Sequence, residues 1–159
     1  KFNINLIVSN NSKAKGLILA EKYKITKKIF NYKNLFFSEI KILDELKKYK
    51  IDLICLAGFM KILRKNFIVK FQGKIINIHP SLLPKYKGLN THQRAINNNE
   101  KFAGCTVHYV NSKLDSGKII IQKKVKILKN DDSKKLAKRV LKQEHVLYPK
   151  AIKKVLSNL

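Results

Sequence analysis

The chain has 159 residues, of which 45% are hydrophobic, so it is long enough and apolar enough to bury the core of one domain. It contains no apolar run of about 18 residues, and its opening stretch lacks the separate apolar core of a signal peptide, so the sequence predicts neither a membrane span nor a leader. Its 35 basic and 10 acidic residues give a formal net charge of +25.

This charge has two explanations. A nucleic-acid-binding protein would use it to neutralise phosphates. Against this, almost all the basic residues are lysines, with arginine only at positions 64, 94 and 139, and arginine is the usual reader of base edges. Lysine, isoleucine and asparagine are all abundant and share AT-rich codons, so we favour compositional drift. A modest attraction for small anions follows in either case.

The two cysteines, Cys55 and Cys105, lie far apart, each within an apolar run. This spacing suits neither a disulfide framework nor a metal site. We expect two buried thiols in a reducing, intracellular setting.

The chain opens with alternating strand and helix patterns. Residues 2–9 are predicted to form a mostly buried strand, and residues 25–30 a weaker second strand. Between them, apolar residues recur at helical spacing over residues 13–23, with Ser12 as the expected N-cap. The apolar positions of this helix are Ala14, Leu17, Ile18 and Ala20.

A second helix and a buried strand follow. Ser38 is the expected cap of the helix. Residues 52–57 (DLICLA) form a nearly continuous apolar run, as in a central parallel strand buried on both faces. Residues 58–63 then either form a loop that offers apolar contacts to a flat ligand or begin a helix that packs on the core. The buried stripe of the second helix is expected to comprise Ile42, Leu43, Leu46 and Tyr49.

Residues 74–88 (KIINIHPSLLPKYKG) are the most informative stretch. A short apolar strand ends abruptly at His79, where Pro80 forces an extended conformation. Asn77 and His79 are two positions apart, so on a strand both side chains point to the same face. In open α/β sheets ligands bind at the carboxyl ends of strands, and we therefore predict a site here.

The remaining pattern adds helices over residues 64–71 and 91–99 and two alternating strands over residues 104–110 and 119–127. The hairpin-type link between these strands predicts that they pair antiparallel.

A last helix is expected to begin at Asp131-Asp132-Ser133 and to end near residue 157, with a kink or break at Pro149. The alternation of strands and helices with one late hairpin predicts an α/β fold with a mostly parallel sheet, in a single domain.

The candidate chemistry centres on Asn77 and His79, because an amide and an imidazolium together can stabilise the oxyanion of a tetrahedral intermediate. Asp115 is a third candidate: a carboxylate near His79 would favour the charged imidazole, but Asp before Ser-Gly is also ordinary turn chemistry. His108 follows the strand period and is interpreted as structural. No set of His, Cys, Asp and Glu has metal-ligand spacing, and no Gly-rich phosphate loop is present.

Four blocks carry a resemblance to a known family: residues 56–63 (LAGFMKIL), 77–84 (NIHPSLLP), 104–110 (GCTVHYV) and 114–117 (LDSG). In this order and spacing they resemble the phosphoribosylglycinamide (glycinamide ribonucleotide) formyltransferases of purine synthesis. The likeness covers essentially the whole chain.

The resemblance implies a doubly wound formyltransferase fold and transfer of a formyl group from 10-formyltetrahydrofolate to the amine of the ribonucleotide, without a metal. The family's catalytic residues fall on Asn77, His79 and Asp115. Its nucleotide contact falls on Gln143 and Glu144. Its folate site falls on Met60, Lys61, Ile62, Leu63, Asn77, Asn111, Ser112, Lys113, Leu114 and Asp115.

The resemblance also implies small-molecule partners, a cytoplasmic location and a monomer or homodimer, with no membrane or nucleic-acid partner. The family begins with a strand and a Gly-rich loop that holds the substrate phosphate, and it continues past the position of Leu159. We expect both of these segments to lie outside this chain, so that residues 1–159 form a partial formyltransferase domain.

Two related activities remain as alternatives beside a basic nucleic-acid-binding protein. Formyltetrahydrofolate deformylase shares the fold and the Asn-x-His motif but passes the formyl group to water. Methionyl-tRNA formyltransferase would carry a further RNA-binding domain. The loop over residues 79–84 and the stretch over residues 88–92 resemble the purine enzyme more closely.

Overall fold

The computed structural model describes residues 2–158, which divide into two compact units. One unit comprises residues 2–52 and 69–73, and the other comprises residues 53–68 and 74–158.

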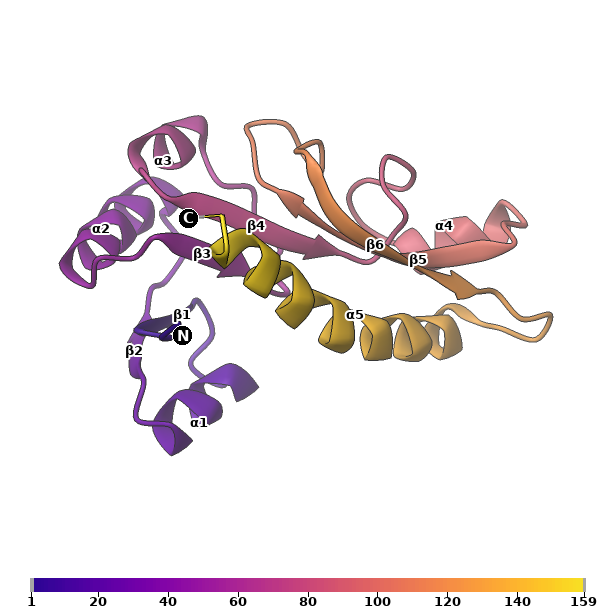
Figure 1. Cartoon of the computed structure of the whole chain (residues 1–159), viewed down its shortest axis with the longest axis horizontal. Coiled ribbons are helices and arrows are strands. Elements are labelled where there is room, and N and C mark those ends of the chain that lie inside the picture. The colour runs from indigo at the N-terminus through magenta and orange to yellow at the C-terminus, as the bar shows by residue number, and fades with distance from the viewer. Residues whose placement is uncertain (1, 159) are drawn as a thin grey trace. The chain divides into compact units, whose positions relative to one another are not determined.

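The first unit holds two strands and two helices. Strands β1 (Leu6–Ser9) and β2 (Thr26–Ile29) pair in parallel, and helix α1 (Lys15–Lys22) connects them (Figure 1). Helix α2 (Leu35–Lys48) follows. The strand predicted over residues 2–9 is shorter than expected and only half-buried.

Both predicted helix caps in this unit are wrong. Helix α1 begins after Ala14 without a side-chain cap, and Ile18, expected in the buried stripe, is 64% exposed. Helix α2 begins one turn before Ser38, because Asn34 accepts a hydrogen bond from the Phe37 amide and caps it instead. Ser38 is buried inside the helix.

The second unit is built on a four-stranded sheet in the order β3-β4-β5-β6. Strands β3 (Leu53–Leu56) and β4 (Lys74–His79) are parallel. Strand β5 (Phe102–Tyr109) runs antiparallel both to β4 and to β6 (Ile119–Lys126). The late antiparallel hairpin is thus confirmed, whereas the antiparallel β4–β5 pair was not predicted.

Strand β3 differs from its prediction as a central strand buried on both faces. It lies at one edge of the four-stranded sheet, where β4 is its hydrogen-bonded neighbour, and it is only half-buried. Cys55 on this strand is exposed, which contradicts the expected buried thiol, whereas Cys105 on β5 is fully buried as predicted.

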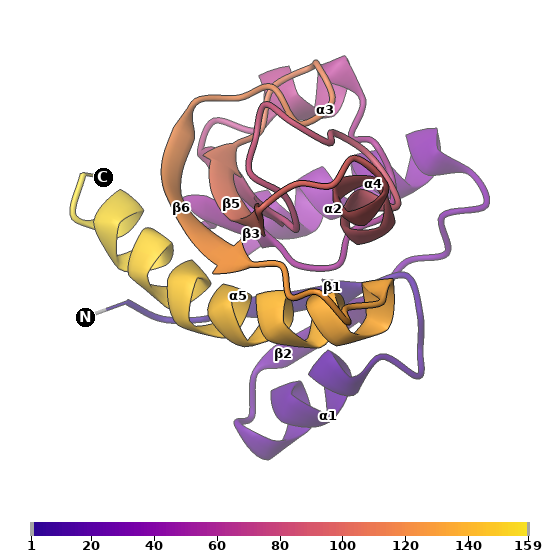
Figure 2. The ribbon, with the colours of Figure 1, turned by 90° about the vertical axis from the view of Figure 1, so that its right-hand side faces the viewer.

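Three helices follow strands of this sheet in the chain. Helix α3 (Lys65–Lys70) follows β3, although its last two residues belong to the first unit, and α4 (Thr91–Asn97) leads into β5. Helix α5 (Ser133–Leu156) lies along β5 and β6, as the two views in Figures 1 and 2 show. The predicted start of α5 at Asp131-Asp132-Ser133 is confirmed, and Asp132 caps the helix by accepting a hydrogen bond from the Lys135 amide.

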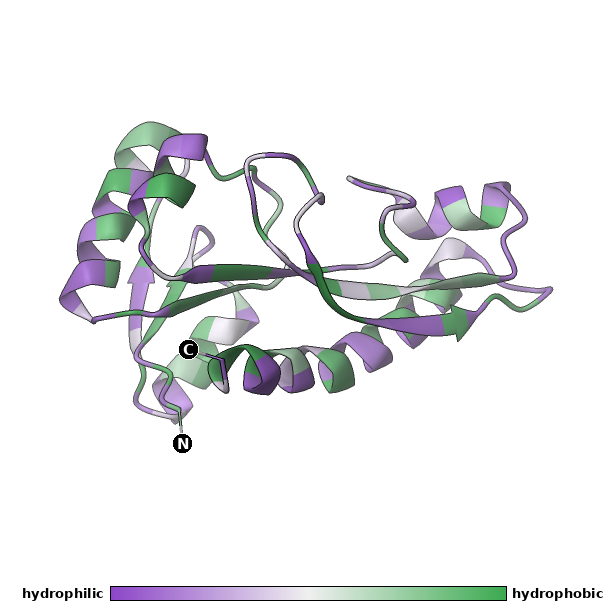
Figure 3. Ribbon diagram, turned by 45° about the horizontal axis from the view of Figure 1, so that its top comes forward, coloured by the Kyte–Doolittle hydropathy of each residue, from purple (hydrophilic) through white to green (hydrophobic). Residues whose placement is uncertain are grey.

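Helix α5 is not broken at Pro149. Although proline removes one backbone hydrogen bond, the buried residues Leu147 and Ala151 on either side hold the helix to the sheet. Hydrophobic and hydrophilic residues alternate along α5 (Figure 3), as expected for a helix with one buried face.

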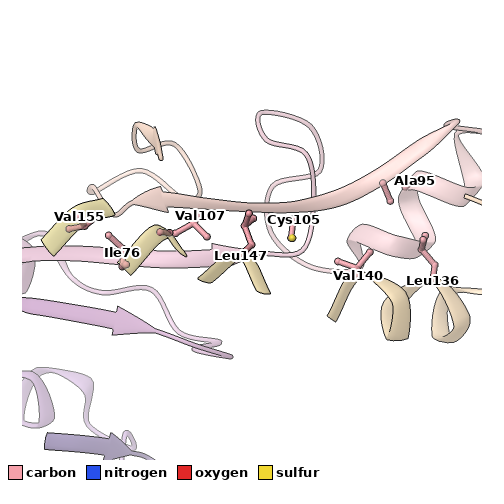
Figure 4. Packing of buried hydrophobic residues seen from close by; sticks show 10 residues of the cluster. Ile76, Ala95, Cys105, Val107, Leu136, Val140, Leu147 and Val155 are labelled. Carbon is pink, nitrogen blue, oxygen red and sulfur yellow. The ribbon is translucent and has the colours of Figure 1, made fainter. Parts of the chain in front are cut away.

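The core of the second unit lies between α5 and the sheet. Figure 4 shows side chains of β4, β5 and α5 meeting there, with Ala95 of α4 at one end. Among residues 2–158, none of the helices combines the length and the apolar character needed to cross a bilayer. The core cluster comprises Ile76, Ala95, Ala103, Cys105, Val107, Leu136, Val140, Leu147, Ala151 and Val155.

This core gives a matched pair of substitutions on one helix. Leu136→Ala should lower the free energy of unfolding by about 2–5 kcal/mol, because Leu136 is fully buried and its loss leaves a cavity. Leu141→Ala is the control, since Leu141 is 47% exposed. Urea titration should show a lower midpoint for Leu136→Ala alone; equal midpoints would contradict the packing of α5.

Candidate active site

Strand β4 carries the candidate catalytic side chains on one face and core side chains on the other. Asn77 pairs with His108 of β5, and His79 pairs with Thr106, so these four side chains share a face of the sheet. The predicted common face of Asn77 and His79 is therefore confirmed. The intervening residues, such as Ile76, point to the core against α5.

Asp115 reaches His79, which the sequence left open. Its Oδ2 lies 3.4 Å from His79 Nδ1, and both side chains are only 8% exposed. The same Oδ2 accepts a hydrogen bond from the Gly88 amide at 2.8 Å. The carboxylate is thus held by an imidazole and by a backbone N–H, away from the competing water that weakens exposed ion pairs.

The turn that carries Asp115 is constrained by its glycine. Asp115 itself has φ +44°, a left-handed conformation that aspartate tolerates better than bulkier residues. A Cβ on Gly117 would lie 1.6 Å from the Tyr109 carbonyl oxygen, so only glycine lets the chain close onto the end of β5. The Asp-Ser-Gly motif therefore forms a turn and also orients the Asp115 carboxylate towards His79.

His79 has an oxygen acceptor at each ring nitrogen. Nδ1 faces Asp115, and Nε2–H donates to the Tyr86 carbonyl at 2.9 Å. Tyr86 belongs to the loop after Pro84, and the Leu83–Pro84 peptide bond is cis. The imidazole is therefore oriented from two sides by different loops.

Two further histidines belong to this cluster, although the sequence pattern assigned neither of them to the site. His108 lies 3.7 Å from Asp115 Oδ1 through its Nε2, and burial lowers its pKa. His92, at the start of α4, has its pKa lowered first by burial and then by the charge of His79. Its buried Nδ1 has no hydrogen-bond partner within residues 2–158. In the sequence, the strand period that His108 shares with Thr106 could have assigned His108 to the site. The transferase-like stretch over residues 88–92 could have assigned His92.

Thr106 fixes the loop that follows His79. Its hydroxyl donates to the Ser81 carbonyl at 2.6 Å and accepts hydrogen bonds from the Leu83 amide at 3.1 Å and from Gln122 Nε2 at 2.8 Å. Gln122 also donates to the Leu83 carbonyl. This network, buried at Thr106 and partly buried at Gln122, ties the loop to β5 and β6, and no pattern in the sequence indicated it.

Most of the residues expected to contact folate lie in two largely exposed segments, whereas Asn77 and Asp115 belong to the cluster around His79. Residues 57–64 form a loop rather than a helix, with Met60 and Ile62 exposed by 73% and 60%, Lys61 exposed and Leu63 buried. Of the two interpretations of this stretch, the loop conformation is confirmed, and its contact with a flat ligand stays a prediction. In the link after β5, Asn111, Ser112, Lys113 and Leu114 are all exposed.

Tyr148 anchors the start of the first of these loops. Its hydroxyl donates to the Leu56 carbonyl at 2.7 Å, at the end of β3, and lies 3.3 Å from the Ile76 carbonyl of β4. Burial raises the pKa of this phenol. The hydroxyl thus clamps α5 to the backbone just before residues 57–63.

The expected nucleotide contacts lie elsewhere. Gln143 and Glu144 are half-buried on α5, the helix that covers the core face rather than the His79 face. Burial raises the pKa of Glu144, which lies near Cys105. The structure therefore does not bring this pair together with the cluster around His79. Gln143 lines a groove of about 410 Å³ together with Lys123, Lys124, Val125, Arg139 and Lys142.

A cation site is not formed by these groups. Within residues 2–158, no three His, Cys, Asp or Glu side chains are arranged to hold a metal ion. The chemistry available to the cluster is therefore that of an amide, imidazoles and one carboxylate: hydrogen-bond donation to an oxyanion and proton transfer.

Comparison with known proteins identifies the family. The formyl transferase family model matches residues 1–152. The chain belongs to the formyl transferase family. It is 44% identical over 153 residues to phosphoribosylglycinamide formyltransferase of Haemophilus influenzae, covering 94% of this chain and 72% of that protein.

Two further relatives match almost the whole of this chain. A solved structure of phosphoribosylglycinamide formyltransferase from Anaplasma phagocytophilum matches with a TM-score of 0.90 and 42% identity, covering 98% of this chain and 76% of the other. The human trifunctional purine biosynthetic protein adenosine-3 is 40% identical over 157 residues, which cover 97% of this chain but only 16% of that protein. The predicted formyltransferase fold is thereby confirmed.

The Thr106 network predicts a loss of stability. Thr106→Val keeps the shape of the side chain but leaves the buried Leu83 N–H and Ser81 carbonyl without the hydroxyl that pairs them, so the free energy of unfolding should fall by about 2–4 kcal/mol. Thr106→Ser keeps the hydroxyl and should retain most of the stability. Thermal denaturation followed by circular dichroism compares the two; a valine variant as stable as the serine variant would contradict the network.

Proposed function

We propose that this chain transfers a formyl group from 10-formyltetrahydrofolate to the amino group of glycinamide ribonucleotide in purine synthesis. The observation that carries the proposal is the buried contact between His79 and Asp115 beside Asn77, in a chain whose relatives are named phosphoribosylglycinamide formyltransferase. An amide and an imidazole at one strand end suit an acyl-type transfer better than any other chemistry open to this cluster.

In the proposed reaction the substrate amine attacks the formyl carbon, and the formyl C=O becomes an oxyanion. One N–H of the Asn77 amide and the His79 Nε2–H, which donates to the Tyr86 carbonyl in this structure, are the donors for that oxyanion. The bond from carbon to the folate nitrogen then breaks. The proton lost by the amine replaces carbon on that nitrogen, with His79 as the relay and Asp115 as its counter-ion.

The binding roles belong to the same proposal. We assign the folate to the loop Met60, Lys61, Ile62 and Leu63 and to the link from Asn111 to Asp115, because Met60, Ile62 and Leu114 leave apolar surface exposed near polar backbone. We assign the nucleotide to Gln143 and Glu144 on the resemblance alone.

Three broader assignments accompany the function. The partners are small molecules, as the relatives' names indicate, and the location is cytoplasmic. Both structural units are assigned to one partial formyltransferase domain, since the single family model spans residues 1–152 and hence parts of each. The relatives give no support to a deformylase or to a nucleic-acid-binding protein.

The decisive assay follows the formyl group in the gene product that contains this chain. With both substrates present, formyl should appear on the amine while free formate stays at background. His79→Ala and Asp115→Ala should each lower kcat/KM by about 10²–10⁴-fold, since they remove the proton relay. Asp44→Asn, an exposed carboxylate on α2, is the control and should leave the rate unchanged.

Two results would contradict the proposal. Formate release at the same rate without the amine would indicate a hydrolase instead. A rate within about tenfold of the parent for His79→Ala or Asp115→Ala would show that the assigned roles are wrong.

A further inference from the structure

His108 makes contacts that go beyond packing. It lies directly opposite Asn77 in the β4–β5 pair, and it is only 2% exposed. Its Nδ1 is 2.8 Å from the Tyr109 carbonyl oxygen, and its Nε2 is 3.5 Å from Asn77 Nδ2. Both ring nitrogens of this buried imidazole therefore have a defined neighbour.

We propose that His108 is a positioning residue for Asn77, whose amide it holds with the N–H end turned towards the reacting oxygen. This inference rests on the proposed function, because it concerns the oxyanion donor of that reaction. It gives His108 a role in the reaction rather than in the core alone.

The tautomer of His108 follows from its first contact. A carbonyl oxygen can only accept, so the Nδ1 that faces Tyr109 must carry a hydrogen. A neutral imidazole has a single N–H, and its Nε2 is then a bare acceptor. The backbone of the residue next to His108 thus determines what Nε2 can offer to Asn77.

The surroundings of His108 keep it neutral. Burial is the largest influence and lowers the pKa of the imidazole, and His79 acts in the same direction. The Asp115 carboxylate and the Tyr109 carbonyl act in the opposite direction. Asp115, from the link after β5, and His79, from β4, are the charged or titratable groups that act on this ring.

A bare Nε2 selects one orientation of the Asn77 amide. The Nδ2 end can donate one N–H to Nε2, and its second N–H remains free for an oxyanion. The flipped amide would set its oxygen lone pairs against the Nε2 lone pair, and it would face the developing oxyanion with an acceptor. His108 therefore excludes the orientation of Asn77 that would repel the transition state.

The same tautomer of His108 leaves the contact between Asp115 and His79 undisturbed. Asp115 Oδ1 lies 3.7 Å from His108 Nε2, while its Oδ2 lies 3.4 Å from His79 Nδ1. A protonated His108 would compete with His79 for the carboxylate and would point an N–H at the Asn77 N–H. Acid pH should therefore impair catalysis through protonation of His108.

Two substitutions separate positioning from packing. In His108→Gln the side-chain oxygen can reach the place of Nε2 and accept from Asn77, whereas in His108→Asn the amide is too short to do so. We expect His108→Asn to lower kcat by about 10–100-fold while KM for the folate stays within about twofold, as for loss of an oxyanion donor. His108→Gln should keep kcat within about fivefold of the parent and should lose the part of the acid limb due to His108.

Equal losses of kcat in the two variants would overturn the proposal, and so would a His108→Asn variant as fast as the parent. A measurement without turnover keeps the test valid if His108→Asn does not fold or if the parent shows no formyl transfer. ¹⁵N NMR of the imidazoles at pH 7, with His108→Gln used for assignment, should show a protonated Nδ1 and a bare Nε2 for His108. The opposite tautomer or an imidazolium would refute the positioning role, whereas absent formyl transfer with the expected tautomer would refute only the proposed function.

Discussion

The arrangement of the site depends on one carboxylate in a confined place. Asp115 has a left-handed backbone, its turn closes so tightly on β5 that Gly117 cannot carry a side chain, and its Oδ2 receives both the Gly88 amide and His79. Three chain segments meet at this group: the end of β4, the loop after Pro84 and the link after β5. Moving the carboxylate would break the contacts among all three segments, so the left-handed backbone at Asp115 and the contact with His79 depend on each other.

The rest of the second unit holds the segments around Asp115 in place. Alternation along β4 and β5 sends one set of side chains to α5 and the other to the site, so the core and the chemistry share the same two strands. Thr106 and Gln122 hold the loop after His79, and Tyr148 holds the backbone before the exposed loop at Met60. The core thus carries loops whose backbone is held by these hydrogen bonds, as preorganised catalysis requires.

The sequence predicted the local features well. Period-two spacing placed Asn77 and His79 on one face, and α5 begins at Ser133, within the predicted start at Asp131-Asp132-Ser133. The four motif blocks indicate the family, because their residues carry its chemistry. What the sequence could not supply were relations across long separations, such as the reach of Asp115 to His79 and the network at Thr106.

The failures have a common physical origin. Serine is a favourable N-cap residue, but it caps a helix only where the chain enters that helix. Ser12 and Ser38 do not lie at these positions, and Asn34 caps α2 instead. The apolar run of β3 suggested a central strand, yet burial depends on neighbours that a single run does not encode. The strand pattern of His108 shows only the face that the side chain occupies, and the proposed tautomer depends on neighbours that the pattern does not encode.

A double-mutant cycle on the central ion pair probes the role of Asp115, with kcat/KM measured for His79→Ala, Asp115→Ala and the double variant. If Asp115 acts only through His79, the double variant should lie within about threefold of the slower single variant, as for groups that work as a unit. Losses that multiply in the double variant would show that the two residues act independently, and would contradict the role of Asp115 as the counter-ion of His79.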